Sequence, residues 1–393
     1  MSVLGDLRAV AVHRDFRKLF AVRLVSQAGD GAFQAGLATL FFFSPERMAS
    51  ATDVAAAFAV LLLPFTVVGP FAGPFLDRWS RRQVLLLGNG LRVVLGLSLA
   101  VLMVTVGVGP AVYVLALVTL GVNRFLLSAL SAGLPRVVPA DQLLMANSIT
   151  PTLGAGAAVA GAGLAFVAGQ VIPPGGLHDG VVLTGAAALF AAASALALRL
   201  GRDQLGPVGR AAPLGSEIAN VLHDLTEGAR YLVARRTPGA ALGVMALHRL
   251  LYGANFIALI LMSRNLLTDP ADASAGLAMF GTLTAISFAG NGLAVVLTPI
   301  AHERVSPATW IVICLGIGAV SQLVLATTPT VTVVAIAAAT IGLSIQGAKI
   351  AVDTIVQRDT HDDFRGRAFA LYDVLYNAAF VGAAAIAAFA LPD

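Results

Sequence analysis

The chain consists of long apolar runs separated by short polar segments. Most runs approach or exceed the roughly 20 residues that a helix needs to cross the hydrocarbon core of a bilayer. This pattern predicts an all-α membrane protein with about 11 spans. The predicted spans are residues 19–43, 54–76, 84–108, 111–134, 144–172, 181–199, 239–263, 273–300, 308–327, 330–356 and 367–391.

The basic residues between the spans indicate the orientation of the helices. With the N-terminus inside, nearly all Lys and Arg residues between spans fall in inner segments, and the outer loops hold only Arg47 and Arg264. Basic loops stay on the cytoplasmic side of a membrane. We therefore predict a cytoplasmic N-terminus and a multi-pass protein of the bacterial cytoplasmic membrane.

The longest hydrophilic stretch divides the spans into six and five. Its second part carries apolar residues at helical spacing from Ile218 to Leu232, which predicts an amphipathic helix on the cytoplasmic membrane face. The predicted organisation is an N-terminal bundle over 1–200, a linker over 201–238 and a C-terminal bundle over 239–393.

A weak internal repeat indicates that the two bundles are related. Residues 23–28, RLVSQA, parallel residues 249–254, RLLYGA, at equivalent depth in the first span of each half. Two pseudo-symmetric helix bundles would produce such a repeat, and paired halves are common in transporters. We therefore expect that a twelfth span is missing after Asp393; the alternative is that the native chain stops there.

Composition excludes several classes of function. Of 393 residues, 58% are hydrophobic and 12% are charged, whereas soluble domains carry about 25% charged residues. The net charge of +4 is scattered between spans, so no nucleic-acid partner is expected. The sequence has no zinc-protease, hydrolase or Walker motif and one cysteine, Cys314, so we predict no catalytic residue, metal or cofactor.

The loop between the second and third spans carries the most specific motif. Residues 73–82 read GPFLDRWSRR, which resembles the G-x-x-x-D-R-x-x-R-[RK] signature of the major facilitator superfamily. The resemblance implies that superfamily's fold and a loop that latches the outward-facing state, in which a carboxylate meets the positive end of a helix. Arg81 and Arg82 also fit a purely topological role. The latch residues are Gly73, Asp77, Arg78, Arg81 and Arg82.

Other segments resemble one bacterial branch of that superfamily, the enterobactin-exporter-like and macrolide-efflux-like carriers. They are DFR at 15–17, SQAGD at 26–30, the stretch 134–147 and RGR at 365–367. The fifth span lacks the Gly-Pro pair of the antiporter signature. In the third span, Asn89 stands before Arg92 where related carriers often have aspartate, and a neutral Asn89 cannot balance Arg92. The glycines of the fifth span, which could allow close helix packing, are Gly154, Gly156, Gly161 and Gly163.

A polar stripe in the first span provides the candidate for proton coupling. Ionisable groups at membrane depth are costly, so the stripe must line the protein interior. Asp30 could change its protonation state when a cavity opens or a substrate binds, with Arg124 as its expected partner. The alternative is a permanent ion pair. The stripe consists of Arg23, Gln27, Asp30 and Gln34, and Asn123 lies beside Arg124.

The second bundle carries its own polar residues at membrane depth. Lys349 and Asp353 are four residues apart and can pair with each other, and Arg249 and Asp373 can also pair. Fixed arginines could accept an anionic or hydrogen-bonding amphipathic compound, or the charges could cancel. The cavity candidates here are Arg249, Tyr252, Asn255, Gln346, Lys349, Asp373, Tyr376 and Asn377.

Together these features favour a monomeric secondary transporter in the lipid bilayer. It would export small amphipathic molecules, such as drugs, siderophores or secondary metabolites, with protons as the coupling ion. The alternatives are a facilitative or uptake carrier for lipid-like or nutrient molecules and, more remotely, a membrane receptor or an intramembrane enzyme.

Overall fold

The computed structural model is helical throughout the part of the chain that it describes, without any strand there. Residues 54–70 of the second predicted span lie outside that part, as do Gly73 and Asp77 of the loop motif. The described residues are 11–42, 71–72, 75–76, 78–139, 142–172, 176–202, 204–206 and 213–390.

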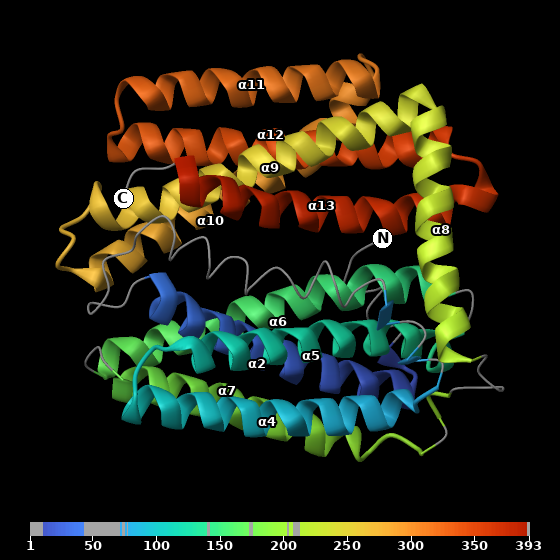
Figure 1. The fold of residues 1–393 in the computed structure, drawn as a ribbon, viewed down its shortest axis with the longest axis vertical. Helices are drawn as coiled ribbons and strands as arrows, with labels where there is room; N and C mark the ends of the chain where they lie inside the picture. Colours follow the sequence, from blue (N-terminus) through green and yellow to red (C-terminus); the bar gives the residue numbers. More distant parts are fainter. Residues whose placement is uncertain are drawn as a thin grey trace. The chain divides into compact units, whose positions relative to one another are not determined.

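The described residues fall into two compact units that divide within helix α8, between Ala219 and Asn220. In the first unit, long helices run side by side (Figure 1). Helix α7 packs against both α2 and α4, while α2 also packs on α6 and α4 on α5. The elements of this unit are α2 Arg14–Phe42, α4 Arg81–Thr105, α5 Pro110–Gly133, the 3₁₀ turn η1 Leu134–Arg136, α6 Leu143–Val171 and α7 Gly176–Ala197.

The second unit contains the C-terminal part of α8 and five further helices. Helix α12 packs against α9, α10 and α11, and α13 packs against α9. The α9–α13 and α11–α12 pairs repeat α2–α6 and α4–α5 of the first unit, in the order that an internal duplication requires. The elements are α8 Leu214–Ala234, α9 Arg236–Asn265, α10 Ala273–His302, α11 Pro307–Thr327, α12 Val331–Asp359 and α13 Asp362–Ala390.

Ten of the eleven predicted spans correspond to helices of the structure. The remaining span, 54–76, lies mostly outside the described residues. Eight described helices are long and apolar enough to cross a membrane by length and composition. Helix α2 does not meet that criterion. In α2 the reason is visible in the sequence, because Gln27, Asp30 and Gln34 interrupt its apolar run.

The predicted amphipathic helix is α8, and its second half is fixed to the rest of the second unit. Arg367, near the start of α13, forms ion pairs with Asp224 at 2.9 Å and Glu227 at 2.7 Å. The rings of Tyr231 and Phe364 stack with centroids 4.4 Å apart. These contacts anchor α8 through its polar and aromatic side chains.

Some helices in each unit pack so closely that only glycine fits between them. A Cβ added to Gly161 of α6 would overlap the backbone carbonyl of Ala28 in α2. In the second unit, a Cβ on Gly342 of α12 would overlap the carbonyl of Ser287 in α10. The role expected for the glycines of the fifth span thus holds for Gly161, whereas Gly163 has open space around it.

Candidate functional site

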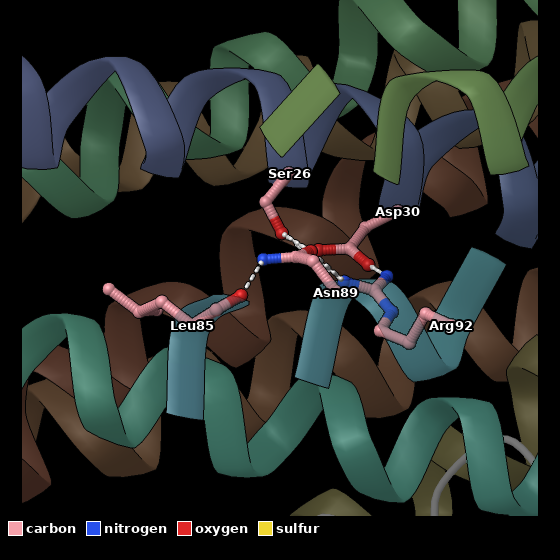
Figure 2. Close-up of polar contacts among 5 residues, drawn as sticks. All are labelled: Ser26, Asp30, Leu85, Asn89 and Arg92. Carbon is pink, nitrogen blue, oxygen red and sulfur yellow. Dashed lines mark hydrogen bonds and ion pairs between the residues drawn. The ribbon is translucent and has the colours of Figure 1, made fainter. Parts of the chain in front are cut away.

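The first unit contains a buried polar network that joins α2 to α4. Asp30 of α2 forms an ion pair with Arg92 of α4, and their side chains point toward one another in Figure 2. Asp30 is 5% exposed and Arg92 is 0% exposed. A carboxylate and a guanidinium buried at this depth each require a partner, because removal from water is costly for an isolated charge.

Neutral side chains complete the network around Arg92. The guanidinium donates hydrogen bonds to the Ser26 hydroxyl at 3.2 Å and to the Asn89 side-chain oxygen at 3.4 Å. Ser26 also donates to Asn89 at 3.0 Å, and the Asn89 amide donates to the backbone carbonyl of Leu85 at 2.8 Å (Figure 2). The guanidinium carbon lies 3.6 Å from the ring centroid of Phe190 in α7, within range of a cation–π interaction.

This geometry corrects one prediction and refines another. The prediction that Asp30 pairs with Arg124 is wrong, because the Asp30 carboxylate forms its ion pair with Arg92. Asn89 does not balance the charge of Arg92, as expected, but it orients the guanidinium as a hydrogen-bond acceptor. Asn123, the neighbour of Arg124, is 3% exposed, and its side-chain oxygen has no hydrogen-bond partner within the described ranges.

The rest of the α2 stripe lies partly inside the unit. Arg23 is 6% exposed and donates to the side-chain oxygen of Gln27 at 3.0 Å and to the hydroxyl of Thr150 in α6 at 3.5 Å. Gln34, at the other end of the stripe, is exposed. Gln34 is therefore not buried within the first unit, and its role as a cavity residue stays a prediction.

The described part of the loop motif packs within the first unit. The Arg78 guanidinium lies 3.7 Å from the carboxylate of Glu217, in the first turn of α8. Arg82 donates to the backbone carbonyl of Leu198 at 3.5 Å. The Trp79 ring packs against Phe125 of α5, with centroids 6.1 Å apart. The latch roles of Gly73 and Asp77 remain predictions, because these two residues lie outside the described part.

In the second unit, Arg249 of α9 is surrounded by aromatic rings. Its guanidinium carbon lies 5.1 Å from the ring centroid of Tyr252, 4.1 Å from that of Tyr376 and 4.3 Å from that of Phe380. Cation–π contacts contribute about 0.5–2 kcal/mol each. The buried Arg249 Nε has no hydrogen-bond partner among the described residues, so the rings replace the expected contact with Asp373, which is exposed.

The other cavity candidates of the second unit are satisfied locally. Lys349 and Asp353 form the predicted i, i+4 ion pair at 2.7 Å. The Asn255 and Asn377 amides donate to backbone carbonyls one turn earlier in their own helices. Gln346 is half-buried on α12.

An apolar pocket lies beside Arg249, between α9, α10 and α12, with one residue from α11. The pocket is partly open, and none of its lining residues is charged. Tyr252 and Phe256 line it from α9, and Ser287 and Ile341 line it from α10 and α12. Sequence reasoning missed Phe256, Phe380 and Phe190, because aromatic residues along a span are usually lipid-facing or packing residues.

The two helical units and the ionisable residues buried within them define a polytopic membrane carrier. The chain belongs to the Major Facilitator Superfamily, whose family model matches residues 19–384. It is therefore a multi-pass cell-membrane protein of a transporter family rather than an enzyme.

Relatives and solved structures agree with this assignment. The chain is 35% identical over 388 residues to MFS-type transporters of Mycobacterium bovis and Mycobacterium tuberculosis, covering 98% of this chain and 87% of each relative. The nucleoside transporter NupG has a TM-score of 0.66 at 14% identity, with 95% of this chain and 90% of that chain covered. The inward-open xylose transporter XylE from E. coli has a TM-score of 0.59 at 11% identity, with coverage of 96% and 89%. At these identities the structural likeness concerns the fold alone.

Proposed function

We propose that this protein is a secondary transporter that exports small amphipathic molecules by alternating access in exchange for protons. The observation that carries the coupling is the buried Asp30–Arg92 ion pair, which gives α2 a titratable group with a partner on another helix. Export rests on the resemblance of segments such as 15–17 and 26–30 to efflux carriers. The apolar pocket of the second unit supports an amphipathic substrate.

The network can accommodate both protonation states of Asp30. When Asp30 is ionised, it balances Arg92. When Asp30 is protonated, Arg92 keeps its hydrogen bonds to Ser26 and Asn89 and its contact with the Phe190 ring. Protonation therefore weakens a link between α2 and α4, two helices that both pack against α7, and it leaves the guanidinium with hydrogen-bond partners.

Coupling would follow from this change in a link between helices. A ligand shifts a conformational equilibrium only by as much as its affinity differs between the two states. A proton that binds Asp30 more tightly in one orientation of the carrier favours that orientation. The proton gradient can then drive substrate uphill.

The test is transport by the full chain in proteoliposomes with an imposed pH gradient. The panel of compounds includes lipophilic cations, macrolides, siderophores and amphipathic anions. Asp30→Asn should abolish gradient-driven transport and retain substrate exchange without a gradient. Asp15→Asn is the matched control, since it removes a carboxylate from the same helix at a partly exposed ion pair with Lys18, and it should keep both activities.

The double variant Asp30→Asn/Arg92→Gln removes both charges and guards against simple destabilisation. It should also exchange substrate without responding to the gradient. Undiminished uphill transport by Asp30→Asn contradicts the coupling role and favours a permanent ion pair. Gradient-independent net uptake by the wild type would favour the facilitative or uptake alternative.

A further inference from the structure

The Arg249 site and the apolar pocket form a continuous surface on α9. Arg249, Tyr252 and Phe256 are spaced i, i+3 and i+7, which places them on one face of the helix. The Tyr252 ring lies against the Arg249 guanidinium and also lines the pocket. The polar and apolar parts therefore share a wall.

The aromatic rings continue this wall into the pocket. The Phe256 ring centroid lies 6.2 Å from those of both Tyr252 and Phe380, and Phe256 lines the pocket. Along α9, Phe256 lies roughly 10 Å beyond Arg249, and Met262, another lining residue, roughly 20 Å beyond it, at 1.5 Å per residue. A molecule that follows this wall would be at least about 10 Å long.

The charged residues around the site indicate which charge a bound ligand must carry. Arg249 has no carboxylate within ion-pair distance among the described residues, and its Nε lacks a hydrogen-bond acceptor. The nearby Lys349 on α12 already has Asp353 as its partner. Arginine presents a planar fork of donors that suits a carboxylate or a phosphate. The Arg249 site thus lacks an anion.

We propose that the second unit binds an amphipathic organic anion, whose acid group pairs with Arg249 and whose apolar body occupies the pocket between α9, α10 and α12. This inference rests on the proposed transport function and narrows its substrate class. Lipophilic cations are poor ligands of this site, because Arg249 repels them. The polar Asn255, Thr284 and Ser287 within the pocket can also accept one hydrogen bond from a substituent on the body.

Three probes that share one apolar group and differ in charge separate the contribution of the charge to the binding affinity from that of the apolar group. They are 6-phenylhexanoate, 6-phenylhexan-1-ol and 6-phenylhexylamine, each titrated calorimetrically into the purified full chain in detergent. We expect the anion to bind at least about tenfold more tightly than the protonated amine, with the alcohol between them. Equal or tighter binding of the amine would overturn the proposal without any variant being made.

Variants then locate the binding energy. Arg249→Gln should weaken the anion about tenfold and leave the alcohol unchanged, whereas Arg249→Lys should retain part of the preference for the anion. Arg304→Gln, an exposed arginine of the same unit, is the charge control. Unchanged anion affinity in a folded Arg249→Gln protein contradicts the assignment.

The pocket is tested by filling it. Ala337→Phe places a ring among the lining residues and should weaken all three probes, whereas Ile336→Phe, at a neighbouring position that is 60% exposed, should not. Loss of binding in both variants, or in neither, contradicts the pocket as the site. Binding needs no proton gradient, so a failure of proton-driven export leaves these outcomes intact and is recognised separately.

Discussion

Arg23 and Arg249 occupy equivalent positions in the internal repeat, and the two units satisfy them differently. Arg23 donates to neutral oxygen atoms of Gln27 and Thr150. Arg249 lies among three aromatic rings. Seven residues further along each helix, the first unit has Asp30 and the second has Phe256.

The difference teaches how a duplicated bundle can divide its tasks. In the first unit, the buried charges find their partners within the protein, because Asp30 and Arg92 neutralise one another. In the second unit, the guanidinium is stabilised by rings and still has donors to offer. The first arrangement suits a proton site, and the second suits a site for an external anion.

The largest expected effect comes from breaking the ion pair of the first unit. Arg92→Gln leaves Asp30 as a buried carboxylate without a cation and should lower the free energy of unfolding by about 3–5 kcal/mol. Arg249→Gln removes cation–π contacts but leaves no unpaired carboxylate within the described residues, so it should lower the free energy of unfolding by less, about 1–2 kcal/mol. Thermal unfolding of both variants in the same detergent measures the contrast, and equal losses would remove the distinction between the units.

The second prediction concerns packing that the units share. Gly161→Ala forces a Cβ onto the Ala28 carbonyl and should cost about 1–3 kcal/mol, as should Gly342→Ala against Ser287. Gly163→Ala and Gly292→Ala have nothing within 4 Å of the new Cβ and serve as matched controls. A similar cost at Gly161 and Gly163 would show that helix propensity, and not the close approach, is being measured.

The third prediction concerns helix starts, where the units differ again. In the second unit, the Ser306 hydroxyl accepts a hydrogen bond from the Thr309 N–H at the start of α11, whereas Ser80 makes no such cap at the start of α4. Ser306→Ala should therefore cost about 1 kcal/mol, and Ser80→Ala should cost clearly less. Chemical unfolding of the two variants decides this, and a reversed order contradicts it.

The smallest expected effect depends on pH and lies at Asp272, the N-cap of α10. Hydrogen bonds from the Ser274 hydroxyl and the Ala275 N–H lower the pKa of Asp272 below its usual value. A lowered folded-state pKa means that the ionised cap stabilises fully above the usual pKa of about 3.9 and loses this effect as pH falls through the folded value.

Stability measured between pH 7 and pH 3 checks this sign. Asp272→Ala should be less stable than the wild type at pH 7, and the difference should shrink at the acidic end. Ala273→Ser, a change beside the cap, should show no such pH dependence. A difference that grows on acidification would contradict the sign.

Most of the fold was predictable from the sequence because hydrophobicity and length report spans directly. The ten described spans and the amphipathic helix follow from this physics. The pairing of Lys349 with Asp353 was also predictable, since residues four apart on a helix are neighbours. These are local relations.

The partner of Asp30 was not predictable from depth alone. Arg92 lies roughly 16 Å beyond the start of α4, and Arg124 lies roughly 14 Å before the end of α5. Both therefore lie at similar depth, and only the lateral packing of α4 and α5 beside α2 decides between them. The i, i+4 spacing of Ser26 and Asp30 and the i, i+3 spacing of Asn89 and Arg92 were the available signals.

The aromatic rings around Arg249 could not be predicted from the sequence for a different reason. Phenylalanines on a span look alike whether they face lipid, core or a cation. The spacing of Arg249, Tyr252 and Phe256 indicates one helix face, but Phe380 reaches the guanidinium from α13, more than a hundred residues away in the sequence. Such a contact depends on how helices pack.

The environment of Arg249, with three aromatic rings around its guanidinium, also affects how the protein responds to the membrane potential. No carboxylate among the described residues neutralises Arg249, so any movement of α9 across the membrane field moves charge. A potential of 100 mV acts on such a movement with about 2.3 kcal/mol per full elementary charge. A bound anion would cancel that charge. The empty and the loaded second unit would then respond differently to voltage, so the electrical signature of transport would report whether the Arg249 site is occupied.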